Sequence, residues 1–229
     1  MCGRFGLPQN WQKTSHFLWE QFQVELKEDS LILPQYNIAP THRLITLIHD
    51  GTRFRVGLSS WGLPLSNQTS QVVINARSES VFEKTMFRQA MKTRRCLILG
   101  GGFYEWKRDE KPSRVFWFQH QTQPWMVFAG LYQVTRDDQG KSHVYTSMLT
   151  THANETMKPI HDRIPVMLNP DQYRHWVDPK TAIDELAFLL KPDNYKGLSF
   201  YEVSSHVNQV KHNDALCLEA INNYKIPPK

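Results

Sequence analysis

Hydrophobic positions along the chain recur at two spacings, one typical of helices and one typical of strands. Asn10 is a suitable N-cap, because its side chain can accept a hydrogen bond from the first turn of a helix. The helix predicted after it carries apolar residues at helical spacing: Trp11, Leu18, Phe22 and Leu26. A second helix is predicted over residues 78–92, with Phe82, Met86 and Ala90 spaced by four. Asn169-Pro170 is typical of the start of a third.

Strands predominate between these helices. Residues 43–49 and 52–59 alternate apolar and polar side chains around Asp50-Gly51, and a glycine there favours a hairpin because it readily takes positive φ. Further strands are predicted at 95–99, 114–118, 126–133, 143–150 and 198–203. The polar stretches 64–71 and 136–141 are too short to be domain linkers. We therefore predict one α+β domain over residues 1–229.

Composition and charge limit the setting. With 229 residues and 40% hydrophobic content, the chain can bury roughly 70% of its unfolded surface. No apolar run approaches the ~18 residues of a membrane span, and a secretory leader pattern is lacking, so we expect a cytoplasmic protein. Its three cysteines are too scattered for a disulfide framework or a zinc motif, and we expect no metal and no cofactor. A net charge of +5 favours an anionic partner and permits nucleic acid.

Cys2 follows the initiator methionine directly, and a residue this small allows Met1 to be removed. The mature chain would then begin with a thiol and a free α-amine on one residue. The amine, with a pKa of ~7.7–8.0, is substantially unprotonated near neutrality, and a modest electropositive setting would draw the thiol toward thiolate. Such a 1,2-aminothiol closes a thiazolidine on an aldehyde, and it can also serve as an N-terminal nucleophile toward amides. The alternative is an incidental cysteine behind a retained methionine.

Two segments place polar groups beside predicted strands. Residues 72–77 form an apolar strand that ends with Asn75 and Arg77, although Asn75 could equally cap the helix predicted after it. Glu105 stands among aromatic residues in a segment that follows three glycines, and a carboxylate in such surroundings is expected to have a raised pKa suited to proton transfer. The glycines lack the spacing of a phosphate-binding loop.

His161 lies in a third such segment, His161-Asp162-Arg163, just before a short apolar stretch. Its imidazole is a candidate proton carrier, with Asp162 or Arg163 fixing its environment. A histidine in a loop is more often simply solvated. The chain has nine other histidines, and no sequence feature distinguishes His161 from them.

Seven short motifs in order along nearly the whole chain resemble the SOS-response-associated peptidase (SRAP) family. They are Met1-Cys2-Gly3-Arg4-Phe5, Tyr36-Asn37-Ile38-Ala39-Pro40, Trp61-Gly62-Leu63, Ile74-Asn75-Ala76-Arg77-Ser78-Glu79, Gly102-Phe103-Tyr104-Glu105-Trp106, His161-Asp162-Arg163-Ile164-Pro165-Val166 and Val207-Asn208. The resemblance implies a strand-rich, barrel-like core of mostly antiparallel sheet with inserted helices.

The same resemblance implies a sensor and shield of abasic sites in single-stranded DNA, in which Cys2 captures the ring-opened sugar aldehyde as a thiazolidine. Glu105 would move protons, His161 would assist opening of the sugar ring and reversal of the link, and Asn75 would position the amine or sugar. Lyase-type or autoproteolytic side activity would accompany capture. The resemblance further implies a monomer, associated with the nucleoid if the source is bacterial.

For DNA binding, the resemblance implies contacts from Arg4, Arg77 and Pro40, although each arginine could instead brace a carboxylate within the fold. The chain departs from the family after Trp61-Gly62-Leu63, where no aromatic follows to wedge open a duplex junction and Leu65 is the nearest apolar substitute. Two other functions stay open. One is a thiol peptidase with Cys2 as nucleophile, acting on proteins or on its own leader; the other is a modified-base binder that does not need Cys2.

Overall fold

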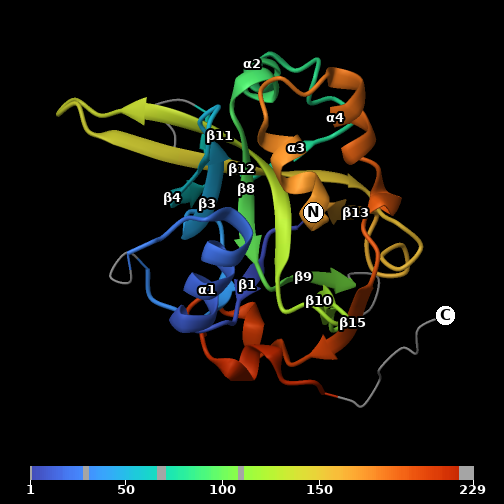
Figure 1. Cartoon of the computed structure of the whole chain (residues 1–229). Coiled ribbons are helices and arrows are strands. Elements are labelled where there is room, and N and C mark those ends of the chain that lie inside the picture. The colour runs from blue at the N-terminus through green and yellow to red at the C-terminus, as the bar shows by residue number, and fades with distance from the viewer. Residues whose placement is uncertain (1, 28–30, 66–70, 108–110, 222–229) are drawn as a thin grey trace.

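The computed structural model describes residues 2–27, 31–65, 71–107 and 111–221, and its core is a closed barrel. The barrel strands, in their order around the ring, are β12 (Ser142–His152), β4 (Phe54–Trp61), β3 (Arg43–His49), β8 (Arg95–Gly100) and β11 (Met126–Arg136). β11 pairs back with β12, which closes the ring, and every pairing is antiparallel except β12 with β4. The predicted strand-rich α+β class with a barrel-like core is confirmed (Figure 1).

Three short strands extend the barrel at β11 and β12. β7 (Asn75–Arg77) runs parallel to β12, whereas β13 (Arg163–Pro165) runs antiparallel to it. β14 (Met167–Leu168) pairs with β11. A separate small hairpin joins β5 (Leu63–Pro64) to β6 (Val72–Val73).

A second, antiparallel sheet lies beside the barrel (Figure 1). Its strands in order are β15 (Leu198–Val203), β10 (Arg114–His120), β9 (Gly102–Lys107), β1 (Phe5–Leu7) and β2 (Gln35–Ile38). Because β9 follows β8 after a single residue, it carries the chain from the barrel into this sheet. Of the candidate site residues, Glu105 lies in β9 of this sheet and Asn75 in β7, which pairs with the barrel.

Helices surround this β framework. The α-helices are α1 (Trp11–Phe22), α2 (Thr85–Thr93), α3 (Tyr173–Val177) and α4 (Ile183–Leu189). Single-turn 3-10 helices are η2 (Pro170–Gln172), η3 (Pro192–Asn194), η4 (Ser205–Asn208) and η5 (Ala215–Leu218). Figure 1 shows α2, α3 and α4 gathered at one end of the barrel and the red C-terminal segment at the opposite end. None of the helices in the described ranges is long and apolar enough to cross a membrane.

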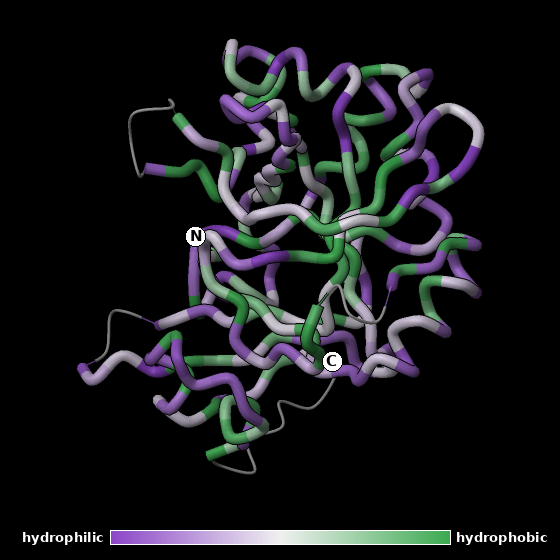
Figure 2. Tube along the Cα trace, turned by 90° about the vertical axis from the view of Figure 1, so that its left-hand side faces the viewer, coloured by the Kyte–Doolittle hydropathy of each residue, from purple (hydrophilic) through white to green (hydrophobic). Residues whose placement is uncertain are grey.

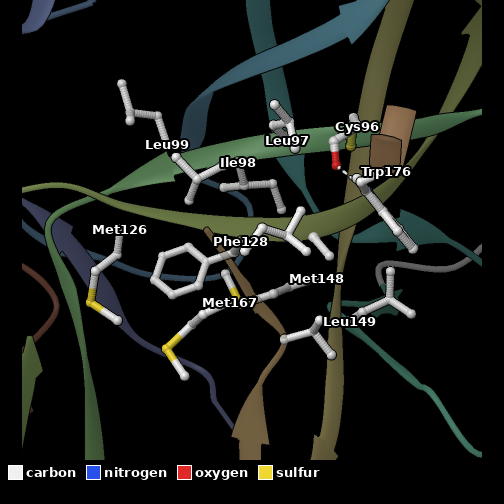
Figure 3. Packing of buried hydrophobic residues seen from close by; sticks show 14 of the residues in the cluster. Cys96, Leu97, Ile98, Leu99, Met126, Phe128, Met148, Leu149, Met167 and Trp176 are labelled. Carbon is white, nitrogen blue, oxygen red and sulfur yellow. Dashed lines mark hydrogen bonds between the residues drawn. The ribbon is translucent and has the colours of Figure 1, made fainter. Parts of the chain in front are cut away.

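The apolar core fills the barrel and continues under the helices. Figure 2 shows hydrophobic stretches running through the middle of the molecule, with hydrophilic ones more frequent toward its periphery. In Figure 3, Phe128 lies among Ile98, Met148 and Met167, all of them buried. The indole of Trp176 packs beside β8 and donates a hydrogen bond to the Cys96 carbonyl at 2.9 Å, so its polar atom is satisfied as well.

Two helix boundaries differ from the predictions. Asn10 caps α1 as expected, accepting from the Lys13 N–H at 3.0 Å, but the helix ends at Phe22 because Gln23 takes a left-handed conformation with φ of 54°. Leu26 therefore lies outside the helix. The second helix begins at Thr85 instead of residue 78. The Ser78 N–H still donates to the Thr150 carbonyl at the end of β7, and residues 78–83 form turns before the helix starts.

The residues noted at a spacing of four do not share the buried face of α2. Ala90 is buried together with Phe87 and Met91, whereas Met86 is exposed and Phe82 precedes the helix. Residues spaced by four lie on one side of a helix, but the spacing is the same for every side. The sequence pattern therefore did not identify which side packs against the barrel.

Candidate functional site

Cys2 and Glu105 come together because β1 and β9 are neighbours in the second sheet. The pairing sets Phe5 opposite Phe103, and the Tyr104 N–H donates to the Arg4 carbonyl at 2.9 Å. Continued past the strand, this register sets Gly3 opposite Glu105 and Cys2 one residue beyond it, and the side chains of Cys2 and Glu105 are both only 1% exposed. The two residues, 103 positions apart in sequence, are thus held by backbone pairing.

The glycines ahead of Glu105 serve packing. An added Cβ at Gly102 would overlap the indole of Trp117 and the Phe118 carbonyl, both from β10. At Gly101 it would lie 2.7 Å from Pro8 Cδ. Glycine is therefore needed for β9 to lie this close to its neighbours, which accounts for these residues without a phosphate site.

Asn75 fixes the backbone of Cys2. Its Nδ2 donates to the Cys2 carbonyl at 2.7 Å, from a position in β7 opposite Met148 of β12. The other amide atom, Oδ1, is buried and accepts no hydrogen bond within the described part of the chain. The alternative role as a helix cap is wrong, because α2 begins ten residues later. A buried acceptor left in this position is suited to an incoming donor.

His161 lies on the other side of Glu105. Its Nε2 is 3.7 Å from Glu105 Oε1, and the ring is mostly buried, with a side-chain exposure of 16%. Nδ1 accepts the Arg163 backbone N–H at 2.9 Å, an arrangement that needs a lone pair on Nδ1 and so assigns the proton of the neutral ring to Nε2. Asp162 Oδ1 lies 2.8 Å from the same Nδ1 and would stabilise the doubly protonated ring. The histidine is therefore positioned by its neighbours, unlike a solvated loop residue.

The Cys2 thiol lies in a buried setting next to a region of negative charge. Burial raises the pKa of the Cys2 thiol strongly, and the nearby Glu105 carboxylate raises it further, whereas a hydrogen bond to the Arg4 backbone opposes this shift. The structure therefore does not give this thiol the electropositive setting that would draw it toward thiolate. A neutral thiol needs a base at the moment it reacts, and Glu105 is close enough for its charge to raise the pKa of the thiol.

Arg163 and Glu79 form a pair that supports the histidine. Arg163 Nη1 and Nη2 donate to the two oxygens of Glu79 at 2.6 and 2.9 Å, and Nη2 also donates to the Thr150 carbonyl. Since the Arg163 N–H bonds to His161, this bidentate pair fixes the backbone from which that bond comes. Arg163 was one of two residues predicted to fix the environment of His161, whereas Glu79, in the same motif as Asn75, was not predicted to take part.

Arg4 is held by a carbonyl and an amide. Its Nη1 donates to Asn37 Oδ1 at 2.7 Å and to the Val207 carbonyl at 2.8 Å, and its guanidinium lies 5.7 Å from the Trp106 ring centroid. The alternative that Arg4 braces a carboxylate therefore does not apply. Asn37, buried and donating to three carbonyls of the C-terminal segment, is a supporting residue that sequence analysis quoted within a motif but gave no role.

Pro40 and Arg77 lie at the periphery of this cluster. Pro40 is half-buried in the turn between β2 and β3. Burial, and then the charge of Arg4, lower the pKa of His42 in the same turn, which shows that the turn lies near Arg4. Arg77 ends β7, is exposed, and pairs with no carboxylate of the described residues, so its charge is available.

The hairpin beyond Trp61 is described in part. Leu65, the apolar substitute for the missing aromatic, directly follows β5 and is 47% exposed. Residues 66–70 of the predicted loop 64–71 lie outside the described ranges. Among the described residues, the one group with three possible metal ligands is His206, Asp214 and Cys217.

Comparisons with known proteins agree with the motifs. The family model described as SOS response associated peptidase (SRAP) matches residues 1–210. The abasic site processing protein YoaM of Bacillus subtilis is 36% identical over 97% of this chain and all of its own length. YedK of Escherichia coli, also an abasic site processing protein, is 26% identical over 96% of this chain and all of its own.

A solved structure shares the fold. The crystal structure of a protein from Bacteroides thetaiotaomicron has a TM-score of 0.84, with 96% of this chain and 99% of that one covered at 22% identity. On the strength of the family match over most of its length, this chain belongs to the SOS response associated peptidase family.

Proposed function

We propose that this protein processes abasic sites in DNA, and that it does so by covalent capture through Cys2 once Met1 has been removed. The observation that carries the proposal is the placement of Cys2 between two polar groups: the Asn75 amide on its carbonyl at 2.7 Å and the Glu105 carboxylate beside its buried thiol, with His161 3.7 Å behind Glu105. Relatives that match essentially this whole chain are named abasic site processing proteins.

Capture proceeds in three steps, each of which moves a proton. The sugar of an abasic site is mostly a closed hemiacetal, so its ring must open to the aldehyde. The Cys2 amine then adds to the aldehyde carbon and water leaves, which gives an imine. Finally the sulfur adds to the imine carbon while the thiol proton is transferred, through a base, to the nitrogen. The thiazolidine product has lost one water relative to the two reactants, and no oxidant is needed.

Glu105 is the base and acid for these steps. Because the pKa of the Cys2 thiol is raised, the thiol is protonated near neutral pH, and its sulfur becomes nucleophilic only as the proton leaves. The Glu105 carboxylate can take that proton and return it to the nitrogen. Amine and thiol belong to one residue, so the second attack is intramolecular and gains from proximity.

Asn75 orients Cys2, and His161 assists the proton transfers. Asn75 Nδ2 fixes the Cys2 carbonyl, and its unsatisfied Oδ1 can accept from the Cys2 amine or from a sugar hydroxyl. The Nε2–H of His161 lies toward Glu105 and can exchange a proton with it, which suits opening of the sugar ring and reversal of the link.

DNA would be held mainly by charge. Arg77 is exposed at the end of β7 and can contact a phosphate, and the net charge of +5 favours a polyanion. Arg4 is two residues from Cys2, and its planar guanidinium is already oriented by Asn37 and Val207. The Pro40 turn supplies an apolar surface for the sugar and base. Single-stranded DNA suits the proposal, because an unpaired strand can bring its sugar to a recessed thiol.

The thiol-peptidase alternative is supported less well. Glu105 could serve as the base for the Cys2 thiol in either reaction, so the preference for capture rests on the relatives named abasic site processing proteins and on the net charge of +5. Lyase-type cleavage fits as a side activity of the proposed chemistry. An imine that forms before the sulfur adds can undergo β-elimination and break the strand.

The experiment is incubation with a single-stranded oligonucleotide that carries one abasic site, followed by a denaturing gel. The control oligonucleotide carries a tetrahydrofuran analogue, which has the same backbone but no aldehyde. We expect a slow-migrating species with the first oligonucleotide alone. Free protein and intact DNA in both lanes would refute covalent capture, and cleavage of a protein substrate with no DNA adduct would favour the peptidase.

A further inference from the structure

Three residues with different ligand atoms gather at the C-terminal end of the described chain, outside the site around Cys2. They are His206 in η4, Asp214 just before η5, and Cys217 within η5. One ligand atom from each lies within 4.8 Å of the other two, and His206 Nε2 is 3.1 Å from both Asp214 oxygens. Cys217 is fully buried, whereas Asp214 is half exposed, so the cluster opens to solvent on one side.

We propose that His206, Asp214 and Cys217 bind a zinc ion. Imidazole, carboxylate and thiolate are the three ligand types that zinc takes in proteins, with bond lengths of about 2.0–2.3 Å. In a tetrahedron these bonds separate the ligand atoms by about 3.3–3.8 Å. His206 and Asp214 are already that close, and Cys217 needs a movement of about 1 Å. A water molecule from the open side completes the fourth position. The hard ions Mg²⁺ and Ca²⁺ are excluded by the sulfur and nitrogen ligands.

Local hydrogen bonds hold the three ligands in place. His206 and Cys217 lie within the single-turn helices η4 and η5, and Asp214 directly precedes η5. Ser204 Oγ accepts the His206 N–H at 3.1 Å and begins η4. Asp214 Oδ1 accepts the Leu216 N–H at 3.0 Å and begins η5, which leaves Oδ2 for the metal. The Cys217 N–H donates to the Asp214 carbonyl at 3.1 Å. The ligands are therefore set by backbone geometry instead of by flexible loops.

The His206 ring is also restrained from the side. His212 stacks on it with ring centroids 3.9 Å apart and an interplanar angle of 12°. His212 Nδ1 lies 2.7 Å from the His206 carbonyl, a contact in which the ring N–H donates. Binding of zinc forms one bond each to sulfur, nitrogen and oxygen, and the Cys217 thiol releases its proton to water. No electron transfer is involved.

The metal would join two turns that support the site around Cys2. The segment between the ligands supplies carbonyls to Asn37, whose Nδ2 donates to Val207, Gln209 and His212 at 3.1, 3.0 and 2.7 Å. The Val207 carbonyl also accepts from Arg4. Zinc at this position would thus fix the segment that orients Arg4, two residues from Cys2.

The spacing of these three residues in the sequence did not indicate that they lie together. His206 and Cys217 belong to different turns, and no two of the three residues form a recognised zinc motif, which is why the sequence analysis expected no metal. The match to the family model ends at residue 210, so Asp214 and Cys217 lie beyond it. The proposal therefore concerns this chain and does not depend on how Cys2 reacts.

The test is titration of the full chain with Co²⁺, a spectroscopic substitute for zinc. It is done in a Cys2→Ser background, because an N-terminal aminothiol itself chelates metals. We expect one Co²⁺ per chain with a thiolate-to-cobalt charge-transfer band in the near ultraviolet, and displacement by Zn²⁺. Cys217→Ser should abolish the band. No band in the parent, or a band that persists in Cys217→Ser, would overturn the proposal.

Two further variants keep the test interpretable if Cys217→Ser does not fold. His206→Gln and Asp214→Asn change residues at the open side of the cluster and should weaken Zn²⁺ binding at least ~10-fold. The matched control is His143→Gln, which disrupts a second His–Asp pair, 2.8 Å from Asp137, that has no cysteine. It should leave binding unchanged. Zinc should also raise the Tm of the parent and of the control, but not of the ligand variants; equal Tm shifts in all would contradict the assignment.

Discussion

The imidazole of His161 and the carboxylate of Glu105 lie 3.7 Å apart, Nε2 to Oε1, in a part of the molecule where the carboxylate is almost fully buried. The ring is held by the Arg163 N–H on its far nitrogen, and the carboxylate by the pairing of β9 with β1. A proton on either group can therefore pass to the other without a large movement, and the Cys2 thiol stands next to the carboxylate.

Replacing Glu105 with Gln should slow formation of the DNA adduct at least ~10-fold, because the amide keeps the shape but cannot accept the thiol proton. The rate is measured from denaturing gels over time, in single-turnover conditions. Glu202→Gln, which alters a glutamate of the same sheet that pairs with Arg114, should leave the rate unchanged. If Glu105→Gln reacts as fast as the wild type, Glu105 has no part in the chemistry.

Asn75→Ala removes the hydrogen bond to the Cys2 carbonyl and the buried acceptor Oδ1. We expect the rate of adduct formation to fall ~10-fold, while the loss of one hydrogen bond lowers the free energy of unfolding by only ~1 kcal/mol. Gel kinetics and thermal unfolding on the same samples separate the two effects. A large drop in Tm with a proportionate loss of active protein would make Asn75 structural.

Arg77→Ala should weaken binding to single-stranded DNA with little dependence on base sequence. Loss of one phosphate contact reduces the slope of log K against log salt by about 0.7. Fluorescence anisotropy across a range of NaCl concentrations measures this slope. Arg136→Ala, an equally exposed arginine at the end of β11, is the matched control. Identical slopes for the two variants would remove Arg77 from the DNA path.

Glu79→Gln should change how stability depends on pH. Partial burial raises the pKa of Glu79, but the hydrogen bonds from Arg163 outweigh this and the pKa lies below its ordinary value of 4.5. The ionised carboxylate therefore contributes stability above pH 4.5 that is lost as the pH falls through the lower, folded-state pKa.

Denaturant unfolding at pH 7 and at pH 3 tests this. The wild type should lose more of its free energy of unfolding between the two pH values than the Glu79→Gln variant does. An equal loss would show that the pair with Arg163 does not couple to titration of Glu79.

Sequence alone predicted much of the framework and part of the site. The apolar pattern predicted β3 at its observed bounds, although four consecutive residues of the strand, 44–47, are buried and its burial does not alternate. It could not indicate that β7 lies parallel to β12, a pairing between distant segments, and without that pairing Asn75 was equally consistent with a helix cap. The raised pKa of the Cys2 thiol could not be predicted for a related reason: the burial of Cys2 depends on β9, a strand about 100 positions away in the sequence.

The family resemblance identified site residues that sequence patterns alone did not single out. His161 was one of ten histidines, and its distinction is three-dimensional: the Arg163 N–H on Nδ1 and Glu105 near Nε2. Asn37 and Glu79 were present in the quoted motifs, but their partners, Arg4 and Arg163, become evident only when the chain is folded.

Mass spectrometry of the reaction products tests the central claim most directly. Wild-type protein and abasic single-stranded DNA should yield one species whose mass is that of the chain without Met1 plus the oligonucleotide, less one water. Digestion should place the sugar remnant on the peptide Cys2-Gly3-Arg4, and Cys2→Ser should give no such species unless the imine is reduced with borohydride. An adduct on any other residue, or a stable adduct of equal yield in Cys2→Ser, would contradict capture by the N-terminal aminothiol.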